Sequence, residues 1–386
     1  MKVLFINQSR NLGGAEKLLA RIVENIGLDS VVAYGSKQFI GELKNNGRII
    51  AYKSKFLGKI NRRQNRFWLL FFILTIFGPI IEIINIINKE RVDVVHANNY
   101  TSVIYALFPS MLLRIPLIWH CHETIDHSWI ERKLKIFLSH FVNAIIVVSN
   151  NVKNHLVSGG VEPRKIVVVY NGISFDEAPL DHQKISKIIG VDASYDIVKM
   201  VTAVATFTEN KGVHNVIKAL AKIKEADPDL LGKIRFYVLG NRENNINHYV
   251  EHLDSLITEN GLEGVVFFLG WVSNTLEVIR NVDICIVPSV HHEAFSLIAA
   301  EAMVASKIVI ASRTGGLSEV VIDKFNGFSF EASDIDGLAN LIRYCVKNIA
   351  SLGEIRQHAY ESATKRFTMD RMISKIKVVY QSVLAK

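Results

Sequence analysis

Residues 283–302 read DICIVPSVHHEAFSLIAAEA, which is typical of a strand, a loop and a helix in direct succession. The apolar run 283–287 is continuous rather than alternating, as in a strand buried on both faces of a parallel sheet. Pro288 and Ser289 start the loop, and the helix is expected to begin near Ala294–Ser296. This stretch therefore predicts one βα unit of a parallel sheet.

The same pattern extends outward along the chain, with helical stretches between short runs rich in Val and Ile. The predicted strands form two series, 2–6, 31–34, 92–96, 116–120, 144–148 and 166–170, then 197–205, 234–239, 265–269, 283–287 and 307–311. Alternation of strands and helices predicts an α/β fold with right-handed βαβ units. We expect two facing Rossmann-like, doubly wound parallel-sheet domains with a shared cleft, and ligands beyond the carboxyl ends of the strands.

The charged stretch 174–190 contains no buried-strand run and is where we place the hinge. The predicted domains are 1–178 and 179–367. The last stretch, 368–386, has a helical pattern and is expected to pack back onto the first domain.

The composition indicates a globular protein, because 49% of the 386 residues are apolar. Met1 leads straight into a strand-like run without the pattern of a secretory leader. Cys121, Cys285 and Cys345 lie far apart and match no metal-binding spacing, which favours reduced thiols. Both features favour a cytoplasmic protein.

The positive charge lies in the first half of the chain. Residues 1–180 hold 22 Lys+Arg and 13 Asp+Glu, a net charge of +9, whereas residues 181–386 hold 23 and 24, a net charge of −1. Six of the basic residues form one cluster without an acidic residue, namely Lys53, Lys55, Lys59, Arg62, Arg63 and Arg66. This cluster is either a solvated face or a site for an anionic partner.

An uncharged stretch, FWLLFFILTIFGPII at 67–81, follows this cluster. Its 15 residues are fewer than the ~20 that a membrane-spanning helix needs. Two interpretations remain open, a buried helix of the first domain or a contact of 53–81 with an anionic membrane surface on the inner face of the cell membrane.

Two carboxylates flank the predicted helix start, Glu293 in the loop and Glu301 in the helix. The N-terminus of a helix offers free N–H groups and a positive dipole end, which suit a diphosphate. Carboxylates beside it suit vicinal hydroxyl groups rather than phosphate. The alternative is that both are surface acids on a helix.

The segment EAFSLIAAEAM at 293–303, with its Glu-x7-Glu spacing, resembles the corresponding motif of glycosyltransferase family 4. The resemblance extends along the chain from Gly13-Gly14 to about Asp336. It implies the GT-B fold, with Glu293 at the donor sugar and Glu301 at the ribose. By resemblance, the diphosphate is bound by the backbone of Phe295, Ser296 and Leu297, with Ala294 beside them in the donor site.

Two more segments resemble the donor site of this family. SRTGGLSEVV at 312–321 contains Gly315-Gly316, which permits a tight turn close to a ligand. VATFTENKG at 204–212 contains Lys211, whose ammonium group is implied to neutralise the leaving diphosphate. The family usually has an arginine where this chain has Thr206, so one cation stands where two are expected.

The first domain opens with Gly13, Gly14 and Glu16 at the start of a helix. They resemble the glycine-rich loop of the family near the donor phosphates and acceptor, and Glu16 is a candidate acceptor contact. The pattern is not G-x-G-x-x-G, which disfavours dinucleotide binding and therefore an NAD-dependent enzyme.

The strand 116–120 leads into His122, which best matches a functional histidine of the family at the donor sugar, although His120 lies on the same strand face. Asn98 and Asn99 end another strand at the same edge and are candidate acceptor contacts. The adjacent pair His291-His292 does not present both rings to one ion easily, so we expect no metal site.

The resemblance implies a retaining hexosyltransferase with His122, Glu293 and Lys211 as its catalytic residues, in which we expect 1–178 to bind the acceptor and 179–367 to bind the donor. By resemblance, the donor is a UDP- or GDP-sugar, with no cofactor, and the acceptor is a saccharide or lipid-linked hydroxyl in bacterial surface polysaccharide or glycolipid synthesis. No nucleic-acid partner is expected. Two alternatives remain. One is a nucleotide-sugar 2-epimerase, and the other is a non-catalytic sugar-nucleotide binding protein, which the departure at Thr206 keeps open.

Overall fold

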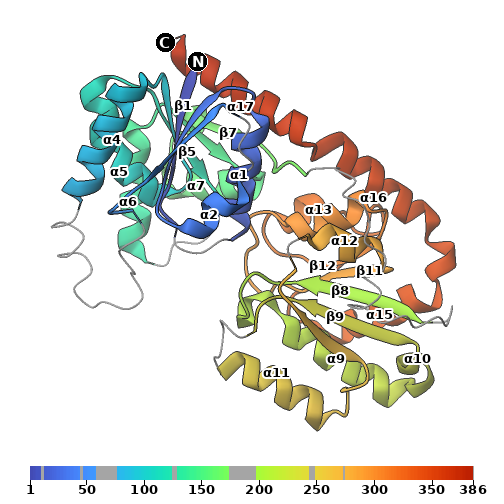
Figure 1. The fold of residues 1–386 in the computed structure, drawn as a ribbon. Coiled ribbons are helices and arrows are strands. Elements are labelled where there is room, and N and C mark those ends of the chain that lie inside the picture. The colour runs from blue at the N-terminus through green and yellow to red at the C-terminus, as the bar shows by residue number, and fades with distance from the viewer. Residues whose placement is uncertain are drawn as a thin grey trace. The chain divides into compact units, whose positions relative to one another are not determined.

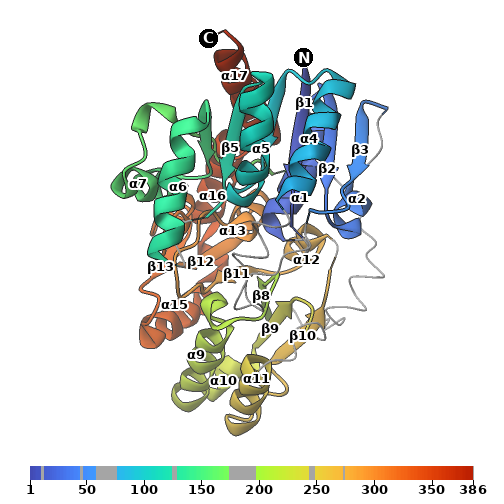
Figure 2. The same cartoon turned by 90° about the vertical axis from the view of Figure 1, so that its left-hand side faces the viewer.

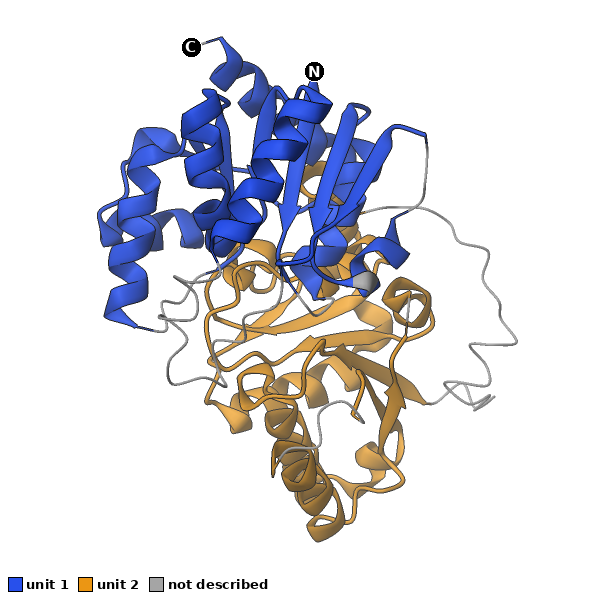
Figure 3. Ribbon diagram, turned by 60° about the vertical axis from the view of Figure 1, so that its left-hand side comes forward, with its two compact units in different colours: residues 1–172, 369–386 blue, residues 173–368 orange. Residues whose placement is uncertain are grey.

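The computed structural model describes residues 1–9, 13–43, 47–57, 76–123, 128–173, 197–242, 248–272 and 274–385. The predicted hinge at 174–190, most of the basic cluster and the apolar residues 67–75 lie outside these ranges. The chain divides into two compact units, residues 1–172 with 369–386, and residues 173–368 (Figure 3).

Unit 1 contains a seven-stranded sheet in which the strand order is β3-β2-β1-β4-β5-β6-β7. Its strands are β1 (Lys2–Asn7), β2 (Asp29–Tyr34), β3 (Ile49–Lys53), β4 (Val94–Ala97), β5 (Leu117–Cys121), β6 (Ala144–Val147) and β7 (Ile166–Val168). Its helices are α1 (Gly14–Asn25), α2 (Lys37–Glu42), α4 (Phe77–Glu90), α5 (Tyr100–Leu113), α6 (Trp129–Phe141), α7 (Asn150–Gly159) and α17 (Met369–Leu384). All the strand pairs are parallel.

Unit 2 contains a six-stranded parallel sheet in the order β10-β9-β8-β11-β12-β13. Its strands are β8 (Val198–Ala203), β9 (Ile234–Leu239), β10 (Val266–Gly270), β11 (Ile284–Val287), β12 (Ile308–Ser312) and β13 (Phe328–Phe330). Its helices are α9 (Val213–Ala226), α10 (Pro228–Gly232), α11 (His248–Glu259), α12 (Thr275–Arg280), α13 (Leu297–Val304), α14 (Leu317–Val320), α15 (Ile335–Lys347) and α16 (Gly353–Arg366) (Figure 1).

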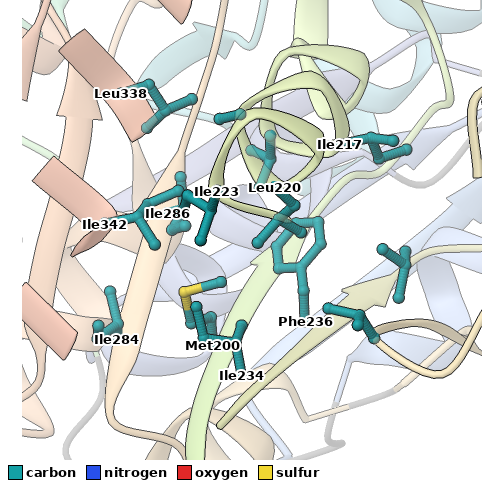
Figure 4. Packing of buried hydrophobic residues seen from close by; sticks show 14 of the residues in the cluster. Met200, Ile217, Leu220, Ile223, Ile234, Phe236, Ile284, Ile286, Leu338 and Ile342 are labelled. Atoms are coloured by element: carbon teal, nitrogen blue, oxygen red, sulfur yellow. The ribbon is translucent and has the colours of Figure 1, made fainter. Parts of the chain in front are cut away.

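The core of unit 2 shows why these sequences form these elements. Met200 and Phe236 on the strands face Leu220 of α9 and Ile342 of α15, and all four are fully buried (Figure 4). Each helix turns one apolar stripe to the sheet, as the period of 3.6 residues per helical turn requires. The side chain of Asp334 begins α15 by accepting a hydrogen bond from the Gly337 N–H at 2.7 Å.

The prediction of an α/β fold with two Rossmann-like parallel sheets is confirmed. Two edge strands, β3 and β13, were missed. β13 has only three residues, and the strand β3 is half-exposed, so neither carries the continuous apolar run of a central strand. The units meet in sequence at 172/173 rather than 178/179, and α17 belongs to unit 1, where it packs against α1.

In both sheets, the strand order reverses beside the first strand of the series, at β1/β4 and at β8/β11. Doubly wound sheets bind ligands at these switch points, beyond the carboxyl ends of the strands. The loops that follow β1, β4, β8 and β11 are therefore where each unit is expected to hold its functional residues. Among the described residues, no helix is long and apolar enough to cross a membrane.

Candidate active site

The loops that follow β8, β11 and β12 are tied together at the carboxyl edge of the unit 2 sheet. The Val290 N–H donates to the Asn210 carbonyl at 2.9 Å, and the Gly316 N–H donates to the Glu293 carbonyl at 2.6 Å. Because β8, β11 and β12 are neighbours in the sheet, these backbone bonds join three loops into one site. Lys211, Glu293 and Gly315 thereby come together from distant parts of the sequence.

Two glycines allow this close approach. A Cβ on Gly212 would lie 1.8 Å from the Pro288 carbonyl oxygen, and a Cβ on Gly315 would lie 2.5 Å from the Glu293 carbonyl oxygen. Both glycines also have positive φ angles, +68° and +53°. A residue with a side chain at either position would force the loops apart, so these glycines fix the spacing of the site.

Lys211 and Glu293 form the charged centre of this site. The Lys211 Nζ lies 3.0 and 3.3 Å from the two carboxylate oxygens of Glu293. The buried Ser289 hydroxyl donates to the same carboxylate at 3.0 Å, and the Ser312 hydroxyl in turn donates to the Ser289 carbonyl at 2.6 Å. The ion pair is partly open to solvent, where such pairs contribute about 1 kcal/mol or less. An anionic ligand can therefore replace Glu293 as the partner of Lys211 at small cost.

Helix α13 begins at Leu297, slightly later than the sequence predicts. The Ser296 side chain caps it by accepting a hydrogen bond from the Ala299 N–H at 3.3 Å. Ala294 and Phe295 therefore belong to the loop, and the buried Phe295 ring packs edge-on against Phe367 at 5.3 Å between centroids. The backbone of this segment, rather than the Phe295 ring, is what the helix start offers to a ligand.

Glu301 is the fifth residue of α13 and is buried. The Thr275 hydroxyl, at the start of α12, donates to its Oε2 atom at 2.7 Å. The hydrogen bond orients the carboxylate, so Glu301 is a positioned acceptor rather than a mobile surface acid.

Thr206 is exposed in the loop that follows β8. Two arginines lie near the carboxyl ends of other strands of this sheet, Arg242 after β9 and Arg313 after β12. Each is paired with a carboxylate, Arg242 with Asp254 and Arg313 with Asp323 at 3.3 Å. Lys211 is thus the cation that the described loops bring against Glu293.

In unit 1, the loop after β1 leads into α1 through Gly13 and Gly14. The Glu16 carboxylate turns back and accepts a hydrogen bond from the Gly13 N–H at 2.9 Å. Gly13 has no side chain that caps the helix, and Glu16 satisfies one of the free N–H groups at its start. The structure thus gives Glu16, a predicted acceptor contact, a defined role in fixing this helix terminus.

His122 follows β5 and contacts Asn98, which follows β4. The distance from His122 Nε2 to Asn98 Oδ1 is 3.1 Å. Burial lowers the pKa of His122 to about 4, so the ring is neutral at pH 7. Because the amide oxygen accepts, Nε2 carries the proton and Nδ1 presents a lone pair.

A chain of buried hydrogen bonds lies behind His122. The Tyr380 hydroxyl of α17 lies 2.8 Å from His96 Nδ1, and His96 Nε2 lies 3.1 Å from His120 Nδ1. The His120 ring stacks on His122 with centroids 4.1 Å apart. Burial lowers the pKa of His96 to about 3 and that of His120 well below its usual value. Of the two candidate histidines, His120 is fully buried, whereas His122 is half-buried.

The two asparagines after β4 have different roles. Asn99 caps α5 by accepting a hydrogen bond from the Ser102 N–H at 2.8 Å. Asn98 is buried, and its Nδ2 atom has no hydrogen-bond partner among the described residues; the same holds for His120 Nε2. Buried polar atoms of this kind are costly unless a ligand or water satisfies them. Asn98 is therefore the better candidate for contact with a ligand.

Four residues that support this site were not predicted from the sequence, namely Ser289, Thr275, His96 and Tyr380. Ser289 bonds to Glu293 within the same loop, whereas the other three act through hydrogen bonds to residues of another element. His96 alone carried a signal, since it ends a strand beside Asn98. A lone Ser, Thr or Tyr in an ordinary loop or helix carries none.

Two family models match the chain. "Glycosyltransferase Family 4" matches residues 43–177, and "Glycosyl transferases group 1" matches residues 185–366. Together they span both units of the structure.

Curated relatives and solved structures are also similar. The N-acetyl-alpha-D-glucosaminyl L-malate synthase of Bacillus anthracis is 25% identical over 69% of this chain and 75% of its own length. The UDP-Gal:alpha-D-GlcNAc-diphosphoundecaprenol alpha-1,3-galactosyltransferase of Escherichia coli is 23% identical over 78% of both chains. The crystal structure of HepE from Anabaena, in complex with UDP-glucose, has a TM-score of 0.84 at 24% identity and covers 99% of this chain and 100% of HepE.

Proposed function

Because the chain belongs to glycosyltransferase family 4 and has two Rossmann-like domains of the GT-B type, we propose that it transfers a hexosyl residue from a UDP- or GDP-sugar to an acceptor hydroxyl, with retention at the anomeric carbon. The observation that carries this proposal is the Lys211–Glu293–Ser289 cluster beside the start of α13. It combines a cation and free helix N–H groups for a diphosphate with a carboxylate for sugar hydroxyls.

Unit 2 binds the donor in this proposal. The diphosphate lies at the start of α13, where the N–H groups of Leu297 and its neighbours and the dipole favour negative charge. Lys211 turns from Glu293 to the diphosphate, and the Glu293 carboxylate is then released to accept hydrogen bonds from the sugar. Glu301, oriented by Thr275, accepts hydrogen bonds from the ribose hydroxyls.

Unit 1 supplies neutral groups. The lone pair of His122 Nδ1 accepts a hydrogen bond from a sugar hydroxyl, and the Asn98 amide donates its unpaired N–H to the acceptor or donor sugar. A neutral imidazole suits this role, because a charged one would compete for the diphosphate. The domain roles, with the acceptor on unit 1 and the donor on unit 2, are part of the proposal.

The chemical step is proposed to proceed on one face of the sugar. The acceptor oxygen bonds to the anomeric carbon as the bond from that carbon to the phosphate oxygen breaks, and the acceptor proton passes to the leaving phosphate. The products are the glycoside and the nucleoside diphosphate. Retention by two displacements would instead need a carboxylate nucleophile about 5 Å from its partner acid. In this proposal Glu293 accepts hydrogen bonds from hydroxyl groups of the donor sugar and does not act as a nucleophile, which favours the single-face route. Trapping a covalent glycosyl–enzyme on a native carboxylate would exclude that route.

Neither a metal nor a cofactor enters this proposal, since Lys211 and the helix start stabilise the leaving group. The acceptor is proposed to be a lipid-linked saccharide of a surface polysaccharide or glycolipid. The name of the Escherichia coli relative gives alpha-D-GlcNAc-diphosphoundecaprenol, a lipid-linked sugar, for that enzyme. The protein would then act in the cytoplasm, peripheral to the membrane.

The test is a donor screen followed by a transfer assay. Thermal shift with UDP-, GDP- and ADP-sugars identifies the donor, because a ligand at 100 times its Kd stabilises the protein by ~2.7 kcal/mol. Transfer to short lipid-linked saccharides, with and without EDTA, then measures activity, and NMR of the new anomeric proton gives the stereochemistry. Inversion, or loss of activity in EDTA, contradicts the proposal. Donor epimerisation without acceptor would identify a 2-epimerase, and donor binding without release of nucleoside diphosphate would identify a non-catalytic binding protein.

A further inference from the structure

Helix α6 buries one charged side chain and exposes several large apolar ones. Lys135 is buried beneath it, with its Nζ 3.1 Å from both Glu131 and Glu123 and 5.0 Å from the centre of the Tyr100 ring. Trp129 on the same helix is 74% exposed. A helix in water normally turns its apolar side inward and its charges outward.

Four large apolar residues of α6 and three of α5 are exposed, whereas others, such as Leu138 of α6 and Val103 of α5, are buried. On α6 the exposed residues are Trp129, Ile130, Phe137 and Phe141, and on α5 they are Phe108, Met111 and Leu112. The α5 residues follow the i, i+3, i+4 spacing of one helix face. The rings of Phe137 and Phe141 contact each other at 5.0 Å between centroids.

The two helices are neighbours on one side of the unit 1 sheet. They follow each other in the crossovers from β4 to β5 and from β5 to β6, and they pack against each other (Figure 2). We call the seven exposed residues the α5–α6 face, that is Phe108, Met111, Leu112, Trp129, Ile130, Phe137 and Phe141. An exposed apolar surface of this kind marks an interaction site rather than ordinary scatter.

The charges around the α5–α6 face are positive. Helix α5 contains no acidic residue, and the single acidic residue of α6, Glu131, is turned to the buried Lys135. Lys133 on α6 and Arg114 at the end of α5 are exposed. Exposed apolar and aromatic residues with only basic residues between them are typical of surfaces that insert among anionic lipid headgroups, and tryptophan is enriched at that depth.

We propose that the α5–α6 face docks onto an anionic lipid surface. The apolar side chains enter the headgroup region, while Lys133 and Arg114 attract the negative surface. The Lys135 cluster anchors α6 to unit 1 from beneath, which leaves the apolar side of the helix for the lipid. This inference deepens the proposed function and rests on it only in that the lipid surface would carry the acceptor.

The test is flotation of the full chain with vesicles of phosphatidylcholine, with and without phosphatidylglycerol. Binding is expected only with phosphatidylglycerol, and high salt is expected to weaken it. The double variant Trp129→Ser/Phe137→Ser is expected to bind at least about tenfold more weakly, because two exposed apolar side chains no longer enter the lipid. The variant Lys133→Gln/Arg114→Gln is expected to lose roughly fivefold per charge.

A matched control replaces exposed apolar residues elsewhere, Tyr360→Ser/Val378→Ser, and is expected to bind vesicles like the wild type. Equal binding by the Trp129/Phe137 variant, or equal binding to vesicles without phosphatidylglycerol, overturns the proposal. Light scattering could instead show a dimer in the wild type and a monomer in the Trp129/Phe137 variant. That result would assign the α5–α6 face to contact with a second copy and would also overturn the proposal.

A water-soluble acceptor separates this inference from the proposed function. If transfer to it is normal in the wild type and in the Trp129/Phe137 variant while vesicle binding shows no difference, docking is wrong and the function stands. If the flotation results follow expectation while no sugar nucleotide is consumed, the function is wrong and docking stands.

Discussion

The candidate site residues of unit 2 and those of unit 1 differ in charge and in burial. In unit 2 a lysine and a glutamate form an ion pair that is partly open to solvent. In unit 1 the corresponding loops carry imidazoles and an amide, and burial keeps the pKa of His122 at about 4, so its ring is uncharged at pH 7. The difference teaches that the unit 2 loops offer charge whereas the unit 1 loops offer neutral hydrogen-bonding groups. Under the proposed function, the first suits a diphosphate and the second suits hydroxyl groups.

The physical basis of this contrast is solvation. A buried charge needs a permanent partner, whereas a partly exposed ammonium can exchange one anion for another. Lys211 can therefore exchange the Glu293 carboxylate for another anion. The buried histidines stay neutral and keep fixed hydrogen bonds, which makes them rigid acceptors and donors. The predictions below test this contrast, from the largest expected effect to the smallest.

Removal of the cation in unit 2 should have the largest effect. Lys211→Ala should lower kcat/KM by roughly 100- to 1,000-fold, as the loss of a group that stabilises developing charge does. The measurement is steady-state transfer with the donor found by the screen. The control is Lys222→Ala on α9, whose side chain pairs with Asp336 at the surface. A loss of less than about tenfold would show that another cation holds the leaving group.

The two carboxylates of unit 2 should separate in binding measurements. Glu301→Ala should weaken binding of both the nucleoside diphosphate and the full donor by roughly ten- to 100-fold, because a charged acceptor is lost. Glu293→Ala should weaken only the full donor. Calorimetric titration with both ligands measures this difference. Identical profiles for the two variants would argue against a ribose role for one and a sugar role for the other.

The neutral histidines of unit 1 should make the protein sensitive to acid. The pKa of His122 is about 4 in the folded protein and near 6.5 in an unfolded chain, so the unfolded chain binds the proton first as pH falls. The contribution of neutral His122 to the free energy of unfolding is fully present above pH 6.5. It is lost as the pH falls, and it stops changing below about pH 4. At pH 5 the loss for His122 is roughly 2 kcal/mol.

Denaturant unfolding at pH 7 and pH 5 measures this loss. His122→Asn should reduce the difference in unfolding free energy between the two pH values, while His248→Gln, at an exposed position, should leave it unchanged. A pH dependence that is the same in wild type and His122→Asn would mean that His122 is not buried as a neutral ring.

The smallest expected effect concerns the hydrogen-bond chain behind His122. Tyr380→Phe leaves His96 Nδ1 without its partner and should lower the unfolding free energy by about 1 kcal/mol. Thermal or denaturant unfolding measures it. Ser382→Ala on the same helix is the control, because the Ser382 hydroxyl bonds only to the Val379 carbonyl one turn away. No difference between the two variants would mean that this chain adds nothing to the unit 1 site.

Much of the fold was predictable from local sequence. The central strands, such as β1 and β11, contain continuous apolar runs, which are typical of strands buried on both faces of a parallel sheet. β3 and β13 were missed because an edge strand is buried only in part and therefore lacks that run. The start of α13 shifted by at most three residues, since Ser296 rather than Ala294 provides the cap.

The candidate site was predictable only where a residue type is distinctive in its place. Glu293, Glu301 and Lys211 have that property, and so does a glycine pair after a strand. Ser289 and Thr275 orient the two carboxylates, yet serine and threonine are ordinary in loops and at helix starts. Their role depends on partners four to 26 residues away in the chain, as their hydrogen bonds show.

The sequence by itself determined that this chain forms two parallel-sheet units and that a cation, two carboxylates and a histidine follow strands. Burial of apolar runs is a local property, and it is visible in the order of residues. Only the tertiary structure decided that Lys211 contacts Glu293, that Tyr380 reaches His96 from the other end of the chain, and that four large apolar side chains of α6 are exposed. These contacts depend on strand order and on helix rotation, which the packing of the whole unit sets.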